Sequence, residues 1–227
     1  MSANAGDGKT AVNAVKMVRR AGLEARYSLM KAYVLTPDEL AAEATMLENA
    51  GVQAITIMDS AGYMFPEQAA EYTRKVKSAV SIPVGFHGHS NLGMAMANAQ
   101  AAEAAGADFI DCGLIGMARS AGNITTEGAL AIFQREGKAL QYDFYALLHF
   151  IDDKLMPAME KEGYHTPIKP LDLILGYAGC HSSFVNTYKE VAKETGTDLY
   201  KLIVETSKRN QKNPTRELME EVASSIH

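Results

Sequence analysis

Two histidines near the middle of the chain have the residue type and the spacing of metal ligands. Residues 86–91 read FHGHSN and follow a short apolar run that begins at Val84. Residues two apart in a strand point to the same face, so the imidazoles of His87 and His89 would lie together. Paired imidazoles suit a divalent metal, and parallel α/β folds build their sites where strands end. We therefore predict a metal site here; the alternative is two histidines with unrelated hydrogen-bonding roles.

Two further polar segments follow neighbouring apolar runs. Residues 59–62 read DSAG and could line the same site, although Asp-Ser-x-Gly is also a common turn before a helix. Residues 113–127 read GLIGMARSAGNITTE, and their glycines let the backbone approach a ligand. Asn123 could give a neutral oxygen to a metal, or it could cap a turn. Arg119 could meet a carboxylate, or it could simply lie exposed on the loop.

One other segment is similar to a functional motif, and we exclude that function. Residues 6–10, GDGKT, resemble the end of a phosphate-binding loop. The full pattern requires a glycine where this chain has Ala3, and it requires a preceding strand. The sequence predicts neither, so we do not expect a nucleoside triphosphatase.

Four short apolar runs are predicted to be strands: residues 25–30, 54–58, 84–87 and 109–114. Pairs of Ala and Gly precede several of these runs at intervals of about 28 residues, the size of one strand-plus-helix unit. Strands that alternate with helices favour a parallel sheet with right-handed crossovers. We therefore predict an α/β fold of the TIM type, a (β/α)-barrel. A complete barrel has eight such units, whereas about four are visible here.

The helices between the strands are predicted from apolar spacing and from their end signals. In one of them Thr36 is the N-cap, Pro37 is the first helical residue and Glu39 is the third. A further helix could begin at Thr125 or Thr126. The predicted helices that join the strands span residues 12–22, 37–49, 65–80 and 91–105.

The chain is predicted to have three parts. Residues 1–140 form a partial (β/α) barrel. Residues 141–170 form a helical connector and a linker, whose Pro residues favour extended backbone before them. Residues 171–227 form a C-terminal helical module that could dock a partner. Its predicted helices are residues 171–177, 182–195, 198–209 and 214–225.

Composition narrows the class of protein. The 227 residues are 47% hydrophobic and 22% charged, which is ordinary for a globular domain. The net charge of -5, without a basic patch, argues against a nucleic-acid partner. No apolar run approaches the roughly 18 residues that span a bilayer, and the N-terminus has no secretory pattern, so we expect no membrane association. Two cysteines, Cys112 and Cys180, favour a reducing cytoplasm over a disulfide framework.

At HGHSN, DSAG and GMARSAGN the sequence resembles the 4-hydroxy-2-oxovalerate aldolases and their relatives, the 3-hydroxy-3-methylglutaryl-CoA lyases and isopropylmalate synthases. Residues 175–184, LGYAGCHSSF, resemble the aldolases specifically, and the likeness extends from about Val12 onward. It implies a barrel with its site at the strand ends and an Mn²⁺ or Mg²⁺ ion held by His87 and His89. It also implies a metal-dependent lyase that cleaves a 4-hydroxy-2-keto acid to pyruvate and an aldehyde.

The resemblance implies roles for three other residues. Asn123 stands where some relatives have a metal ligand. Ser60 stands where the family has a serine that contacts the keto acid. His181 stands where the aldolases have a catalytic tyrosine, and histidine can exchange protons near neutral pH, so it is our candidate catalytic residue. The same change is compatible with another substrate or with lost activity.

The family's third metal ligand, an Asp beside an Arg on its first strand, has no counterpart in this sequence. The likeness begins after the family's fourth strand, so the chain by itself could be inactive. Three hypotheses follow: a fragment that folds only partly, a half-barrel that pairs with itself or with a separate N-terminal half, and a non-catalytic module that binds a partner. The resemblance implies an acylating aldehyde dehydrogenase as that partner.

Overall fold

The computed structural model describes residues 1–164 and 170–226. The predicted linker, residues 165–170 at the end of the helical connector, therefore lies almost entirely outside the described residues. No described helix is long and apolar enough to cross a membrane.

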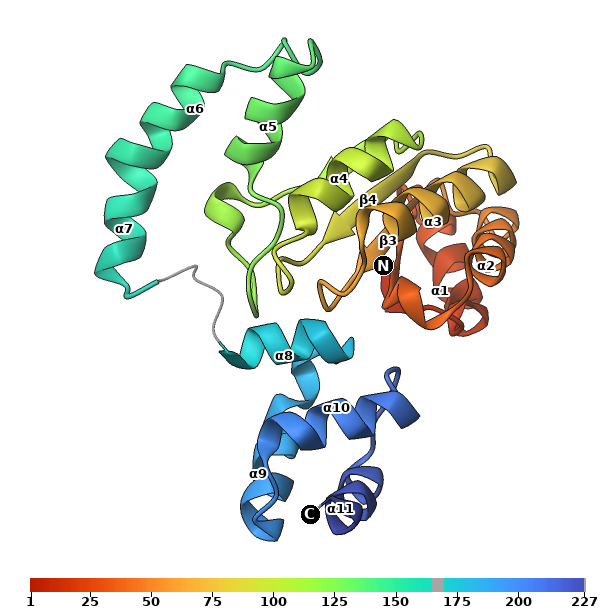
Figure 1. Ribbon diagram of the computed structural model, residues 1–227. Coiled ribbons are helices and arrows are strands. Elements are labelled where there is room, and N and C mark those ends of the chain that lie inside the picture. Colours follow the sequence, from red (N-terminus) through yellow and green to blue (C-terminus); the bar gives the residue numbers. More distant parts are fainter. Residues whose placement is uncertain (165–169, 227) are drawn as a thin grey trace.

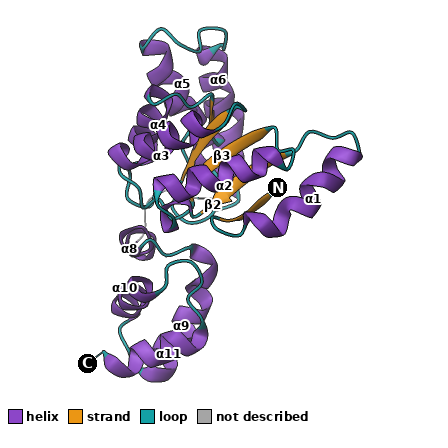
Figure 2. Ribbon diagram, turned by 90° about the vertical axis from the view of Figure 1, so that its right-hand side faces the viewer, coloured by secondary structure: helices purple, strands orange, loops and turns teal. Residues whose placement is uncertain are grey.

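Five parallel strands form one sheet in chain order. Figure 1 shows helices alternating with these strands, and Figure 2 shows the same layers from the side. Neighbouring strands that follow each other in sequence, each joined by a helix, have the topology of a barrel wall. The strands are β1 (Ser2–Asn4), β2 (Arg26–Met30), β3 (Ala54–Asp59), β4 (Val84–Gly88) and β5 (Phe109–Asp111), and the joining helices are α1 (Gly8–Arg20), α2 (Pro37–Asn49), α3 (Pro66–Ala79) and α4 (Ala95–Ala104).

The predicted α/β fold of barrel type is confirmed, but the number of strands was too low by one. The extra strand is β1, which pairs in parallel with residues 28–30 of β2. Its sequence, SAN, is too short and too polar to give a strand signal, so only its pairing with β2 identifies it.

The strand β1 also precedes GDGKT, so the prediction that no strand lies before that segment was wrong. The exclusion of a phosphate loop still holds, because Ala3 breaks the pattern. The structure adds a physical reason. The Glu43 carboxylate accepts hydrogen bonds from the N–H groups of Gly6 and Gly8, each at 2.6 Å. The backbone donors that a phosphate would need are already used by a side chain of the protein.

The start of α2 is the boundary that the sequence predicted best. The Thr36 hydroxyl accepts from the Glu39 N–H at 3.3 Å, and the Glu39 carboxylate accepts from the Thr36 N–H at 2.8 Å. This reciprocal capping is what the residue types predict.

Among the strands and the helices that join them, three boundaries differ from prediction by three residues or more. Helix α1 begins at Gly8, because the Glu43 carboxylate receives its first N–H groups. Helix α4 begins at Ala95, four residues late, because residues 91–94 form a turn in which Gly93 has a φ of 71°. Strand β5 ends at Asp111, since residues 114–116 form a 3₁₀ turn.

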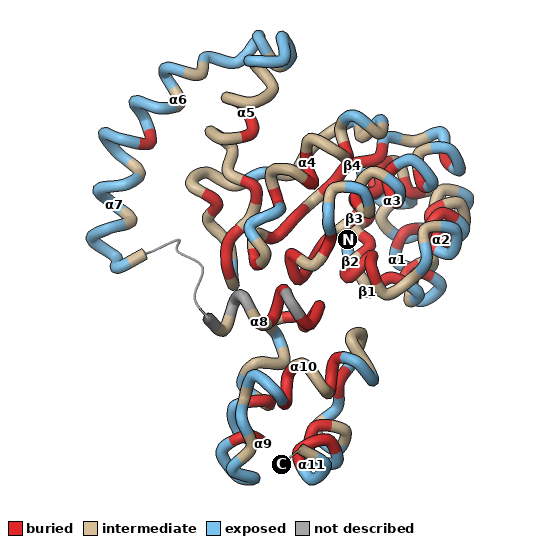
Figure 3. The backbone as a smooth tube through the Cα atoms, viewed as in Figure 1, coloured by how far each residue is buried: buried red, intermediate tan, exposed pale blue. Residues whose placement is uncertain are grey.

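After β5 the chain forms a segment that we call the arm, residues 126–161. It consists of α5 (Thr126–Arg135), α6 (Phe144–Phe150), a π-helical turn (Ile151–Leu155) and α7 (Met156–Lys161). Figure 3 shows that α6 and α7 are mostly exposed, and among their residues and those of the turn between them only Ile151 is buried. The arm is therefore held by few apolar contacts.

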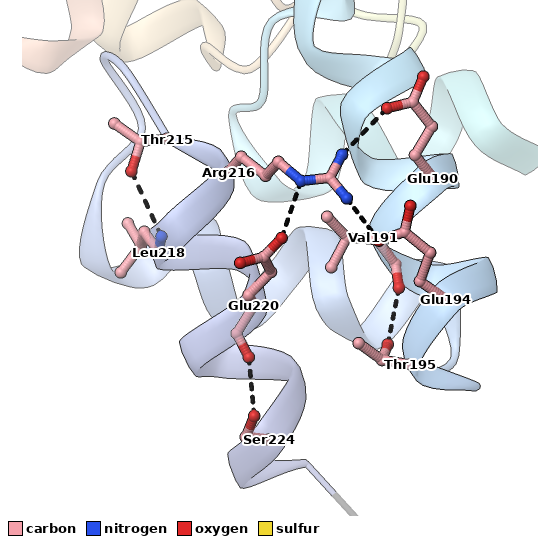
Figure 4. Close-up of polar contacts among 9 residues, drawn as sticks. All are labelled: Glu190, Val191, Glu194, Thr195, Thr215, Arg216, Leu218, Glu220 and Ser224. Carbon is pink, nitrogen blue, oxygen red and sulfur yellow. Dashed lines mark hydrogen bonds and ion pairs between the residues drawn. The ribbon is translucent and has the colours of Figure 1, made fainter.

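The C-terminal module contains α8 (Pro170–Ala178), α9 (Val185–Thr195), α10 (Leu199–Arg209) and α11 (Arg216–Ser225). It has a hydrophobic cluster of its own, distinct from the cluster beneath the sheet; its fully buried members include Tyr188, Leu202 and Met219. Figure 4 shows Arg216 of α11 ion-paired with Glu190, Glu194 and Glu220. Exposed pairs of this kind contribute little each, so the cluster supplies most of the stability and the pairs orient α11 against α9.

Candidate functional site

The ends of β3 and β4 are packed together, backbone against backbone. The His89 N–H donates to the Asp59 carbonyl at 3.1 Å. Gly62 has a φ of 59°, and a Cβ at this position would lie 2.5 Å from both the Asn91 nitrogen and the His89 carbonyl oxygen. Only glycine fits this conformation and this space. We call the polar surface made by residues 59–62, 86–91 and 113–125 the strand-end rim.

The DSAG segment forms the turn that supports this rim. The Asp59 carboxylate is fully buried and accepts from the N–H groups of Tyr63 at 2.9 Å and Met64 at 3.0 Å. Burial raises the pKa of Asp59 to about 6, although the backbone hydrogen bonds act in the opposite direction. The Ser60 hydroxyl accepts from the Lys31 N–H at 2.9 Å and keeps its own proton available to donate.

His87 and His89 lie side by side at the end of β4, with ring centroids 5.3 Å apart. Asn123 lies next to His89, because the two residues form an isolated antiparallel bridge. Three atoms of this group are buried without a hydrogen-bond partner among the described residues: His87 Nε2, His89 Nδ1 and Asn123 Oδ1. Buried polar atoms are normally paired, so three neighbouring exceptions require an explanation.

A divalent cation would satisfy these atoms. Burial first, and then the neighbouring His87 and Arg119, lower the pKa of His89 to about 3, so its ring is neutral, as a metal ligand must be. The ring also hydrogen-bonds to the backbone of Gly122, the usual way in which a ligating histidine is oriented. Within the described residues no group of three His, Cys, Asp or Glu side chains is placed to hold a metal. The donor set in this chain is therefore two imidazoles and one amide oxygen.

His181 lies in the turn between α8 and α9, and the structure brings it to the rim. The Arg119 guanidinium contacts His181 Nε2 and donates to the Ser182 hydroxyl at 3.2 Å. On the other side of the ring, His181 Nδ1 accepts from the Ser183 N–H at 3.2 Å and lies 2.8 Å from the Ser183 hydroxyl oxygen. Burial, then Arg119 and Lys31, lower the pKa of His181 to about 4. This histidine is neutral at neutral pH.

Helix α8 places this turn over the rim. A Cβ on Gly176 would lie 2.7 Å from the Asn91 Cβ, so the absent side chain lets α8 approach the segment after β4 closely. The Tyr33 hydroxyl donates to the Gly179 carbonyl at 3.3 Å. The predicted residues Ser60, His87, His89, Asn123 and His181 thus lie around the ends of β3 and β4. Their roles stay predictions, because position alone does not test them.

Comparison with known proteins identifies the family. The HMGL-like family model matches residues 6–153. The chain belongs to the HMGL-like family.

Curated relatives of this HMGL-like chain are named aldolases. It is 34% identical over 212 residues to 4-hydroxy-2-oxovalerate aldolase 2 of Rhodococcus opacus, a match that covers 93% of this chain and 60% of the relative. It is 35% identical over 212 residues to 4-hydroxy-2-oxovalerate aldolase of Moorella thermoacetica, covering 92% and 61%. The chain spans about three fifths of the length of these relatives.

Solved structures share the fold of the HMGL-like chain. The carboxyl transferase domain of Rhizobium etli pyruvate carboxylase superposes with a TM-score of 0.78 at 14% identity, covering 100% of this chain and 42% of that one. HMG-CoA lyase from Brucella melitensis superposes with a TM-score of 0.57 at 20% identity, covering 63% and 55%. At these identities the likeness establishes the fold alone.

Sequence reasoning missed Lys31, which lies beside the rim. Lys31 directly follows β2, has a left-handed φ of 56° and is only 4% exposed. Its ammonium donates to the Lys212 carbonyl at 2.6 Å and lies 4.8 Å from the centre of the Phe184 ring. The available signal was a lysine immediately after a predicted strand, at the end where parallel sheets bind ligands.

A large hollow in the described structure lies elsewhere. It has a volume of about 650 Å³ and lies between β5, α5 and the start of α6, where its lining includes Phe109, Ile110, Phe133 and Leu147. None of its lining residues is a predicted site residue. An apolar hollow beside a sheet edge is better suited to binding a polypeptide segment than to binding a keto acid that is coordinated to a metal.

Proposed function

We propose that this chain carries the metal-binding and substrate-binding part of an aldolase that depends on Mn²⁺ or Mg²⁺ and cleaves a 4-hydroxy-2-keto acid to pyruvate and an aldehyde. One observation carries the proposal: the buried, unpartnered atoms of His87, His89 and Asn123 at the end of β4. The HMGL-like family and the names of the aldolase relatives support it.

The chemistry divides among the rim residues. His87, His89 and Asn123 would hold the ion, which supplies a Lewis acid for the keto oxygen when it is bound. Hard cations prefer carboxylate oxygen, so we expect the substrate or another polypeptide to supply further oxygen ligands. Ser60 would donate its hydroxyl proton to the keto acid.

Cleavage also requires proton transfer. The bond between carbons 3 and 4 breaks, its electron pair stays on carbon 3, and the proton of the 4-hydroxyl goes to a base as the aldehyde forms. We assign the base to the neutral imidazole of His181, whose Nε2 contacts Arg119 in the free protein.

Calorimetric titration with Mn²⁺ tests the metal site. We expect micromolar binding to the wild-type chain and none to the His87→Ala/His89→Ala double variant. A His149→Ala variant is the control, because His149 is exposed and lies on α6, outside the rim. Wild-type affinity in the double variant would contradict the proposal. Release of pyruvate from a set of 4-hydroxy-2-keto acids, followed with each variant, connects binding to cleavage.

A second proposal concerns the open sheet. Within the described chain β1 pairs only with β2, and β5 pairs only with β4, so both edges of the sheet are unpaired. Exposed edges bind further strands, and the hollow beside β5 offers apolar surface to an added unit. We propose that a second copy or a separate N-terminal half closes the barrel. Light scattering after size-exclusion chromatography tests this, and a strictly monomeric mass at all concentrations would exclude the second copy.

The C-terminal module suggests a third interaction. We propose that it docks an acylating aldehyde dehydrogenase, which would receive the released aldehyde. A pull-down with the full chain should succeed, and one with a chain ending at Pro170 should fail. Equal capture by both would exclude docking through the module.

A further inference from the structure

Arg119 of the rim and Lys31 beside the rim have no acidic partner among the residues that the structure describes. Among the described residues no carboxylate lies within 4.0 Å of either charge. The Arg119 guanidinium instead contacts the neutral His181 ring, and the Lys31 ammonium contacts a carbonyl and an aromatic ring. Buried charges are normally paired with charges of opposite sign, so Lys31 in particular requires an explanation.

Both cations contact the turn that carries His181. Arg119 contacts His181 and Ser182, whereas Lys31 lies over the ring of Phe184, which is 6.4 Å from the ring of His181. Burial first, and then Arg119 and Lys31, lower the pKa of His181, and burial lowers the pKa of Lys31 with a smaller contribution from Arg119. Positive charges gathered at one turn repel each other, and a bound anion would relieve that repulsion.

Lys31 also has the backbone of a functional position. Its φ of 56° lies in the left-handed region, which is unfavourable for a residue with a long side chain. The Ser60 hydroxyl fixes this conformation by accepting the Lys31 N–H. The fold thus holds an uncommon backbone conformation that directs an ammonium group toward the Phe184 ring and the Lys212 carbonyl.

We propose that Arg119 and Lys31 bind an anionic group, a carboxylate or a phosphate, on the aldehyde side of the keto acid. The proposal rests on the function proposed above. His181 receives the proton of the 4-hydroxyl, so groups beside His181 face carbon 4 and the atoms beyond it. The keto acid's own carboxylate and carbonyl face the metal-binding residues instead. The substrate is therefore a 4-hydroxy-2-keto acid with a second negative charge.

The same contact couples recognition to proton transfer. Arg119 lies against the His181 ring, and its positive charge disfavours the protonated ring that forms when His181 acts as a base. An anion that draws the guanidinium away removes this effect, and its negative charge favours the protonated ring. If the part of the substrate that becomes the aldehyde were neutral, Arg119 would stay in contact with His181.

Calorimetry with two five-carbon keto acids in the presence of Mg²⁺ tests the proposal. 2-Oxoglutarate and 2-oxopentanoate differ only in a terminal carboxylate against a terminal methyl group. We expect the full wild-type chain to bind 2-oxoglutarate at least about tenfold more tightly, since hydrogen bonds to charged groups are the strong ones. Arg119→Gln should bring the two affinities to within about twofold, and Arg119→Lys should keep part of the preference.

Matched variants make the test specific. Arg135→Gln is the control for Arg119→Gln, because Arg135 is exposed on α5. Lys31→Met should also remove the preference, with Lys16→Met on the exposed side of α1 as its control. Arg119 lies on an exposed loop, so its variants should fold even if those of the buried Lys31 do not.

The outcomes separate this inference from the proposed function. Equal wild-type affinities for the two acids, or an unchanged preference in Arg119→Gln, overturns the inference and leaves the aldolase proposal intact. Binding of neither acid in the presence of Mg²⁺ overturns the proposed function and the inference with it. Competition against 2-oxoglutarate identifies the anion: displacement by inorganic phosphate but not acetate indicates a phosphate group, and the converse indicates a carboxylate.

Discussion

The strand-end rim and the arm both leave groups without partners, and the groups are of opposite kinds. The rim buries polar atoms of His87, His89 and Asn123 that have no hydrogen-bond partner among the described residues. The arm exposes large apolar side chains, with Tyr145 75% and Phe150 47% exposed. A buried lone pair is satisfied by a cation or by a polar small molecule, whereas exposed apolar surface is satisfied by another polypeptide. The comparison therefore separates where this chain would bind its ligand from where it would bind a protein.

The largest expected effect comes from breaking the packing of the rim. Gly62→Ala places a Cβ against two backbone atoms in a left-handed conformation, so we expect a loss of about 3–5 kcal/mol in the free energy of unfolding. Gly93→Ala is the control, because Gly93 also has a positive φ but open space around it, and it should cost about 1 kcal/mol. Urea denaturation of both variants measures the difference. Equal losses would show that the close approach at Gly62 does not matter.

The next largest effect on stability should come from binding a metal ion at the rim. Mn²⁺ at a hundredfold excess over its Kd should raise the free energy of unfolding by about 2.7 kcal/mol, because the ion binds only the folded chain. The His87→Ala/His89→Ala variant should show no such gain. Thermal denaturation with and without Mn²⁺ measures it. An equal gain in the double variant would place the bound ion elsewhere.

The buried carboxylate of Glu43 already has hydrogen-bond partners, so its removal should affect stability but not metal binding. Glu43→Ala removes the acceptor for the Gly6 and Gly8 N–H groups and should cost about 2 kcal/mol of stability. The affinity for Mn²⁺ should not change, since Glu43 lies on α2 against the start of α1 and not at the rim. Denaturation and calorimetry on the same variant test both statements, and a weakened Mn²⁺ site would show that the two regions are coupled.

Acid should weaken the rim through His181. Its pKa in the folded chain is about 4, below the ordinary value of 6.5, so the unfolded chain binds more protons between these values. Stability is therefore lost as the pH falls from 6.5 toward 4, by about 1.4 kcal/mol for each pH unit at most. His181→Gln should remove this part of the pH dependence, and His149→Gln should not. Urea denaturation at pH 7 and pH 5 measures it; identical slopes in wild type and His181→Gln would refute it.

The smallest effect on stability should come from the arm. Tyr145→Ser removes an exposed ring, so the free energy of unfolding should change by less than about 0.5 kcal/mol. If the arm contacts a second copy, the same variant should lower the self-association seen by sedimentation. A large loss of stability with unchanged mass would show that the arm packs within its own chain.

The two regions also differ in how well the sequence described them. The capping residues Thr36 and Glu39 are close in sequence, so their types were sufficient to predict the start of α2. The pair His87 and His89 was equally visible, because the period of a strand places residues two apart on one face. Such local signals predicted the parallel α/β fold and the position of the two histidines side by side at the end of β4.

Contacts between distant segments were decided only by the tertiary structure. The pairing of β1 with β2 depends on a backbone ladder that the side chains of SAN do not reveal. The contact of Arg119 with His181 joins residues 62 positions apart, and that of Lys31 with Lys212 joins residues 181 apart. No periodicity links such residues, since only the packing of α8 onto the end of β4 brings them together. The sequence by itself determined which residues could do chemistry at the ends of strands, and the tertiary structure decided which cations face His181.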